Sequence, residues 1–158
     1  MPDPVNPIQP RYASLTPNLV CRNAAEAIEF YKAMFGAVEI RRMPGPGGSI
    51  MHAELKIGDS IFFVSDTMSK LPPALPEAGQ SNPSYLHVQV TDVDDVFQRA
   101  VAAGARTDMP VQNMFWGDRY GKITDPFGQQ WGIATHKEDV APEEVQRRMK
   151  ELLAKAAG

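Results

Sequence analysis

The 158-residue sequence is poor in the residues that build disulfides and metal sites, with one cysteine and three histidines. Because Cys21 is the only cysteine, the chain can form no intramolecular disulfide, which fits a reducing cytoplasm. Lysine and arginine (16) do not exceed aspartate and glutamate (19), so the net charge of −3 gives no basic surface for nucleic acid. No apolar run approaches the roughly 20 residues of a membrane-spanning helix, and the N-terminus shows no signal-peptide pattern. We therefore predict a cytoplasmic protein that binds neither nucleic acid nor membrane.

Proline, by contrast, is abundant. The fourteen prolines cluster at the N-terminus, in MPGPG and in LPPALPEAGQSNP, where they separate ordered elements. These shifts in composition divide the chain into a tail (1–13), a first module (14–65), a Pro-rich linker (66–83), a second module (84–138) and a C-terminal helix (139–158).

The first module begins with a predicted strand at 14–20. Asn23 is placed to cap a helix over 24–35, whose apolar residues recur at helical spacing, and Gly36 is placed to end that helix in the left-handed conformation. Three strands are then predicted at 38–43, 50–57 and 60–65.

The same pattern restarts after the linker. A strand at 84–90 is followed by Asp92, a second helix cap, and by an apolar stripe that ends at Gly104. Strands are predicted near 110–114, at 117–124 and at 130–135, and the turn Asp125-Pro126-Phe127-Gly128 joins the last two. The chain therefore reads as two tandem βαβββ modules, an α+β fold, with a further helix that begins near Pro142.

Three segments carry a resemblance to a known family. AAEAIEFYKAMFGAVE resembles the first-module helix and following strand of the vicinal oxygen chelate superfamily, which includes glyoxalase I, bleomycin-resistance proteins and extradiol dioxygenases. YLHVQVTDVDDVFQRAVAAGA resembles the start of its second module. FWGDRYGKITDPFGQQWGIATHKED is similar to the end of the PhnB-like branch, whose members are often described as 3-demethylubiquinone methyltransferase-like. The resemblance covers about residues 14–139.

The resemblance implies a U-shaped mixed sheet with helices outside and a cavity inside. It also implies a divalent metal held by inward-facing side chains of four strands, commonly His and Glu. Residue by residue, those positions fall at Thr16, near Phe62, at His87 and at Gly132. Only His87 is a good metal ligand, whereas a catalytic site needs about three protein ligands. We therefore expect no metal cofactor at the usual positions.

Strand alternation predicts further residues of the cavity. In the strand at 50–57, His52 and Glu54 alternate with an apolar set, and in the strand at 84–90, His87 and Gln89 do the same. We expect Trp116 and Arg119 near the mouth of the cavity. The predicted ligand-binding residues are Thr16, Asn18, Phe62, Gln89, Trp116, Arg119 and Gly132.

His52, Glu54 and His87 leave three interpretations open. They are candidates for a displaced divalent-metal site of two imidazoles and a carboxylate. They are equally candidate catalytic residues, an acid–base pair with a histidine close to its working pH. The structural interpretation is that Glu54 accepts hydrogen bonds from His52 or an arginine and satisfies buried polarity.

The resulting functional prediction is a small-molecule-binding protein with a degenerate metal site, similar to the bleomycin-resistance members. The alternative is a divalent-metal-dependent lyase, isomerase or dioxygenase that uses His52, Glu54 and His87. Methyltransferase activity is disfavoured, because no glycine-rich nucleotide loop follows the first strand. The resemblance also implies a homodimer.

Overall fold

The computed structural model describes residues 6–67 and 84–158. The start of the predicted tail and most of the predicted linker lie outside the described residues. Contacts divide the chain into two units, Met1–Glu77 and Ala78–Gly158, and we describe each unit by itself.

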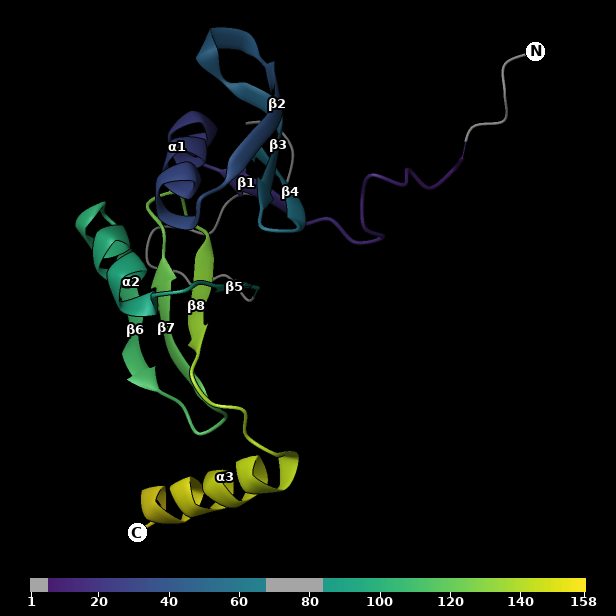
Figure 1. The fold of residues 1–158 in the computed structure, drawn as a ribbon. Helices are drawn as coiled ribbons and strands as arrows, with labels where there is room; N and C mark the ends of the chain where they lie inside the picture. The colour runs from purple at the N-terminus through teal and green to yellow at the C-terminus, as the bar shows by residue number, and fades with distance from the viewer. Residues whose placement is uncertain (1–5, 68–83) are drawn as a thin grey trace. The chain divides into compact units, whose positions relative to one another are not determined.

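The first unit contains one four-stranded mixed sheet and one helix that packs on it (Figure 1). The strand order is β1-β4-β3-β2, with β1 parallel to β4 and the other pairs antiparallel. The elements are β1 (Asn18–Cys21), α1 (Ala24–Phe35), β2 (Val38–Pro44), the short 3-10 helix η1 (Pro46–Gly48), β3 (Ile50–Ile57) and β4 (Ser60–Asp66).

Helix α1 begins and ends where its capping residues predict. The Asn23 side chain accepts a hydrogen bond from the Glu26 backbone N–H (3.3 Å), which satisfies one of the free donors of the first turn. Gly36 adopts φ 65°, a conformation that costs glycine little and closes the last turn. On the buried stripe of α1, the Tyr31 ring lies 5.9 Å from the Phe62 ring of β4. The helix is thereby fixed on one face of the sheet.

The second unit repeats this arrangement and adds a helix. Its strand order is β5-β8-β7-β6, again with the first pair parallel and the others antiparallel (Figure 1). The elements are β5 (Leu86–Gln89), α2 (Val93–Ala102), β6 (Arg106–Asn113), β7 (Asp118–Thr124), β8 (Gln130–His136) and α3 (Pro142–Ala156).

The turn between β7 and β8 is held by a buried carboxylate. Asp125 Oδ1 accepts hydrogen bonds from the backbone N–H groups of Phe127 (3.0 Å) and Gln129 (2.9 Å). Its Oδ2 accepts a hydrogen bond from the Trp131 indole N–H (2.9 Å). Gly128 supplies the positive φ of 98° that the turn requires. This network fixes the alternation of β8, in which Trp131 and Ile133 are buried as predicted.

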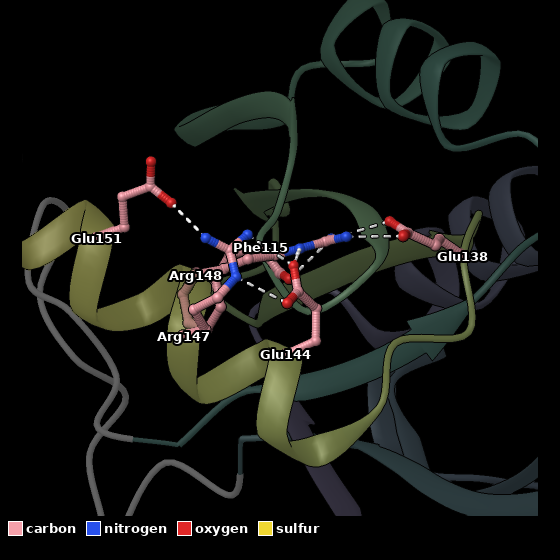
Figure 2. Close-up of polar contacts among 6 residues, drawn as sticks. All are labelled: Phe115, Glu138, Glu144, Arg147, Arg148 and Glu151. Carbon is pink, nitrogen blue, oxygen red and sulfur yellow. Dashed lines mark hydrogen bonds and ion pairs between the residues drawn. The ribbon is translucent and has the colours of Figure 1, made fainter.

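Helix α3 is held to the second unit by charged side chains, and none of its residues is buried. The Arg148 guanidinium donates to both carboxylate oxygens of Glu138 (2.8 and 2.9 Å), to Glu144 (2.8 Å) and to the Phe115 carbonyl (3.5 Å), as Figure 2 shows. Hydrogen bonds from Arg147 and Arg148 lower the pKa of Glu144 to about 2. The first two turns of α3 are therefore joined to the chain that leaves β8.

The α+β class, the tandem βαβββ modules and the C-terminal helix are confirmed. The largest differences from prediction are at the starts of two strands. β1 begins at Asn18 rather than at 14, because Pro17 has no N–H for the ladder, although its carbonyl accepts from the Phe63 N–H (2.8 Å). β6 spans Arg106–Asn113 and is longer than the predicted 110–114. The U-shaped arrangement of the two sheets stays a prediction.

Within the described residues, no helix has the length and apolar character needed to span a membrane.

Candidate functional site

Each sheet has one face that carries the helix of its module and one that points away from it, which we call the distal face. In the first module, Glu54 pairs with Phe63 across β3 and β4, and Leu55 pairs with Phe62. Since Phe62 contacts α1, alternation places Glu54 and Phe63 on the distal face. The predicted orientation of His52 and Glu54 is consistent with this register.

A buried carboxylate lies at the centre of the first distal face. Glu54 is 1% exposed, and Arg11 Nη2 donates to both of its oxygens (2.9 and 2.8 Å). The Tyr12 hydroxyl (2.5 Å) and Arg41 Nε (2.7 Å) also donate to it. Arg41 reaches the same oxygen through Nη2 as well. The chain before β1 thus folds back over the sheet and surrounds Glu54 with hydrogen-bond donors.

These contacts determine the charge of Glu54. Burial by itself raises the pKa of a carboxyl group, but the hydrogen bonds from Tyr12 and Arg41 and the charges of Arg11 and Arg41 outweigh it. The pKa of Glu54 therefore lies below its ordinary value, and the group is ionised at neutral pH. Such a carboxylate is a hydrogen-bond acceptor and not a proton donor.

His52 is a further titratable neighbour of Glu54. Its Nε2 atom lies 3.5 Å from Glu54 Oε1, and its ring lies 4.8 Å from the Phe63 ring. The structural interpretation of Glu54, hydrogen bonding to an arginine, describes most of its contacts. The structure brings His52 and Glu54 together, whereas His87 belongs to the second unit, so the three-residue site stays a prediction.

The face assigned to Phe62 from the sequence is wrong. Phe62 is 4% exposed and packs against Tyr31 on the helix-covered face, while Phe63 occupies the distal face. The register of the two modules explains the error. The core pair Leu55–Phe62 corresponds to Ile123–Trp131, so the first-module counterpart of Gly132 is Phe63. A shift of one residue moves a strand side chain to the other face.

The distal face of the second module is aromatic. His87 pairs with Gly132 across β5 and β8, and the rings of His87 and Tyr120 stack with centroids 5.7 Å apart and planes at 17°. The Tyr120 side chain fills the space over Gly132, since a Cβ atom built there would lie 2.6 Å from the Tyr120 hydroxyl oxygen. A phenol therefore occupies the place where the resemblance puts a metal-binding carboxylate.

Tyr120 is held in its neutral form. Burial and a hydrogen bond with Tyr85 raise the pKa of its phenol well above the ordinary value. The Lys122 ammonium lies 4.1 Å from the centre of the Tyr85 ring, a cation–π contact. The face thus exposes an imidazole and a tyrosine ring, whereas the neutral phenol of Tyr120 is 5% exposed.

Trp116 joins this aromatic group, and its predicted place near the mouth of a cavity stays a prediction. Its ring packs edge-on against Tyr120, with centroids 5.9 Å apart, and its indole N–H donates to Asp118 (3.0 Å). Arg119 does not join it. Arg119 lies on the α2 side and donates two hydrogen bonds to Asp94 (2.6 and 2.7 Å), which corrects its predicted position near the mouth.

Of three further predicted residues, Asn18 and Gln89 lie in strands and Thr16 does not, and no side-chain hydrogen bond joins them to the two clusters among the described residues. Asn18 is exposed and pairs with Phe63 between β1 and β4. Gln89 is exposed at the end of β5. Thr16 is half-buried just before β1.

The family positions for a metal do not fit a metal in this chain. His87 has an imidazole, but the space at Gly132 is filled by a neutral phenol, and Phe62 faces the helix. Among residues 6–67 and 84–158, no group of three or more His, Cys, Asp and Glu side chains is arranged to hold a metal ion. At the displaced position, both oxygens of Glu54 already accept from guanidinium groups.

A groove outside the predicted site lies between α3 and the end of β6. Its volume is about 460 Å³. It is lined by Gln112, Asn113, Met114, Phe115, Arg148, Glu151, Leu152 and Lys155.

Sequence reasoning missed the residues that surround both candidate sites. Arg11 and Tyr12 lie in the predicted tail, more than forty positions from Glu54, and no local pattern predicts that contact. Two others had a usable signal. Arg41 lies opposite Glu54 in the β2–β3 pair, so cross-strand pairing could have predicted their contact. Strand alternation along β7 could have assigned Tyr120 to one face of its sheet.

Comparison with known proteins places this fold in a family. The model of the glyoxalase/bleomycin resistance protein/dioxygenase superfamily matches residues 11–133. An uncharacterised protein of Mycobacterium tuberculosis is 39% identical over 139 residues, which cover 86% of this chain and 82% of that protein.

Solved structures give the same fold. TioX from Micromonospora sp. ML1 is 29% identical, with a TM-score of 0.58 over 82% of this chain and 100% of that one. The PhnB protein of Bacillus cereus, named as a putative 3-demethylubiquinone-9 3-methyltransferase, has a TM-score of 0.63 over 78% of this chain and 99% of that one; at 19% identity it shows the fold alone. With well over half of its length matched by the family model, the chain belongs to the glyoxalase/bleomycin resistance protein/dioxygenase superfamily.

Proposed function

We propose that this protein binds a small planar molecule and that the distal face of the second module is its recognition surface. The observation that carries the proposal is the Tyr120 side chain over Gly132, stacked on His87. An aromatic surface with a neutral phenol suits stacking and hydrogen bonding better than it suits metal-dependent chemistry. The protein is then a cytoplasmic binding protein, expected as a homodimer, rather than an enzyme.

The residues have separate roles in this proposal. Trp116, Tyr85 and His87 supply ring surfaces, and the buried Tyr120, a neutral phenol hydrogen-bonded to Tyr85, holds the His87 ring by stacking. Lys122 is placed against the Tyr85 ring and adds a positive charge at the edge of the group.

The proposal is tested with the two tryptophans as reporters. In the Trp131→Phe variant, Trp116 is the one remaining tryptophan, and it lies on the distal face. Titration with a neutral planar compound such as benzamide should change the fluorescence of Trp116 until the site is saturated. In the Trp116→Phe variant, the buried Trp131 remains and the change should disappear. A thermal shift should accompany binding, since a ligand that binds only the folded chain stabilises it. An unresponsive Trp116 across a panel of aromatic and dicarbonyl compounds would contradict the proposal.

The competing function is a divalent-metal-dependent lyase, isomerase or dioxygenase that uses His52, Glu54 and His87. The contacts of Glu54 argue against it, because a cation there would have to displace Arg11 and Arg41. Metal analysis of protein purified without chelator decides between the two. One divalent ion per chain, lost in both Glu54→Ala and His87→Ala, would support the enzyme.

A further inference from the structure

The distal face of the first module carries an excess of positive charge. Alternation places Lys56 on the same face as Glu54, Arg41 lies opposite Glu54 in the β2–β3 pair, and Arg11 reaches over both. Against these three cations, Glu54 is the one carboxylate that the described strand register assigns to this face. The other acidic strand residues turn elsewhere, as with Asp66, whose oxygens accept the backbone N–H groups at the start of α1 and β3.

The two guanidinium groups are only partly used by Glu54. Arg11 bonds to Glu54 through Nη2, and Arg41 through Nε and Nη2. Among contacts with the described residues, this leaves Nη1 of both side chains and Nε of Arg11. The side chains are 48% and 59% exposed, while Glu54 is 1% exposed. A molecule in solution therefore meets guanidinium N–H groups and not the carboxylate beneath them.

Aromatic rings stand beside these donors. The Tyr12 ring packs edge-on against Phe63, with centroids 5.5 Å apart, and the His52 ring also contacts Phe63, with centroids 4.8 Å apart. The Arg11 guanidinium lies 4.5 Å from the centre of the Tyr12 ring. These contacts hold the guanidinium groups in place before a ligand arrives, which reduces the entropy lost on binding.

We propose that Arg11 and Arg41 form a subsite for an oxyanion, a carboxylate or a phosphate-like group, on a small organic ligand. Guanidinium groups recognise such groups through paired, charge-assisted hydrogen bonds. Glu54 positions both arginines from below and neutralises one of their charges, so the cluster keeps a net positive charge. The inference goes beyond the proposed function, because this subsite lies on the other module and is tested separately.

The test compares three probes on the full chain by NMR titration of backbone amides. Benzoate and inorganic phosphate carry the oxyanion, and benzamide has the ring of benzoate without its charge. We expect benzoate and phosphate to shift amides of β2 and β3 saturably and benzamide to leave them unchanged. In Arg41→Gln, affinity for benzoate should fall by about tenfold, as expected for the loss of a charge-assisted contact. Raising the salt concentration should weaken benzoate binding further, since the site is half exposed.

Arg42→Gln is the matched control. Arg42 follows Arg41 in β2 but bonds to Glu39. The substitution therefore removes the same charge without changing the proposed subsite. Its affinity for benzoate should match that of the unmodified protein. Glu54→Gln should bind benzoate several-fold more tightly, because the internal competitor for the guanidinium groups has lost its charge. Equal losses of benzoate affinity in Arg41→Gln and Arg42→Gln would show that only the net charge of the protein matters, and would overturn the proposal.

The outcomes separate this inference from the proposed function. Benzamide binding at Trp116 without any benzoate or phosphate response in the first module overturns the subsite and leaves the aromatic surface in place. Benzoate and phosphate binding that depends on Arg41, with no response at Trp116, supports the subsite and contradicts the aromatic surface.

Discussion

The two modules have the same strand order, and β3–β4 has the same register as β7–β8, yet their distal faces differ in chemistry. Phe63 of the first module corresponds to Gly132 of the second, and His52 corresponds to Tyr120. In the first module, the larger side chain is on β4 and the imidazole packs beside it (4.8 Å). In the second, β8 carries no side chain at this position and the phenol of β7 fills the space.

The helix-covered faces of the two modules, in contrast, share the same contact between the last sheet strand and the start of the helix. Asp66 at the end of β4 accepts a hydrogen bond from the N–H of Ala24, the first residue of α1 (2.8 Å). Thr135 at the corresponding position of β8 accepts from the N–H of Val93, the first residue of α2 (2.8 Å). The comparison indicates that packing and capping fix one face of each module, while the other face is free to diverge in charge and size.

The strongest test of this contrast is to place valine at each of the two corresponding positions. Gly132→Val should destabilise the protein by about 3 kcal/mol, the upper part of the usual range for overpacking, because its Cβ would meet the Tyr120 hydroxyl. Phe63→Val should cost only about 1 kcal/mol, since the ring is half-buried and truncation leaves no closed cavity. Urea denaturation measures both values.

Tyr120→Ala in the Gly132→Val background is the control for that mechanism. If the clash is with the phenol, the double variant should recover much of the lost stability, with a coupling of about 1 kcal/mol or more. Additive losses would show that Gly132 is required for a reason other than Tyr120.

A second prediction concerns the charged face of the first module. Arg41→Gln should destabilise the protein by about 1 kcal/mol, because Glu54 is buried and loses one of its cations, although the guanidinium itself is more than half exposed. Arg42→Gln, which removes an exposed pair with Glu39 on the other face, should change stability by less than about 0.5 kcal/mol. Equal effects of the two substitutions in urea denaturation would contradict the role assigned to the distal face.

Local patterns predicted most of the fold. Asn23 and Gly36 bound α1, and the Asp125–Gly128 turn joins β7 to β8, because caps and turns depend on residues that are neighbours in the sequence. The boundary of β1 was predicted too early because alternation continues through Pro17, whose missing N–H ends the ladder.

The candidate sites were less predictable because they depend on contacts between distant segments. Alternation alone put His52 and Glu54 on one face of β3, and the two side chains lie together in the structure. It did not predict Arg11, which reaches Glu54 from outside the sheet, or the Asp94 pair that draws Arg119 to the α2 side. Phe62 was misplaced by one position because the register between the modules was carried over from the resemblance rather than from the core pairs.

A third prediction follows from the charge of Glu54. Its pKa in the folded protein lies below its ordinary value of 4.5, so ionised Glu54 stabilises the fold above that pH. The contribution is lost as the pH falls below 4.5 and through the lowered folded-state pKa. The free energy of unfolding should therefore fall less steeply with acid in Glu54→Gln than in the unmodified protein. Parallel curves for the two proteins would exclude Glu54 as a source of the acid sensitivity.

The smallest effect on stability is expected at His136, where the chain leaves β8. The first module has no histidine at the corresponding position. The Nδ1 atom of His136 lies 2.8 Å from Asp118, and its Nε2 atom lies 2.8 Å from Asp139. The hydrogen bonds to Asp118 and Asp139 raise the pKa of His136 above its ordinary value of 6.5. The protonated ring therefore stabilises the chain exit below pH 6.5, and this contribution is lost as the pH rises through the raised pKa. An NMR titration of the ring should give a midpoint above 6.5, and Asp118→Asn should lower it. A midpoint at or below 6.5 in the unmodified protein would mean that the two carboxylates do not hold this ring in solution, and that the ends of β4 and β8 differ less than the structure indicates.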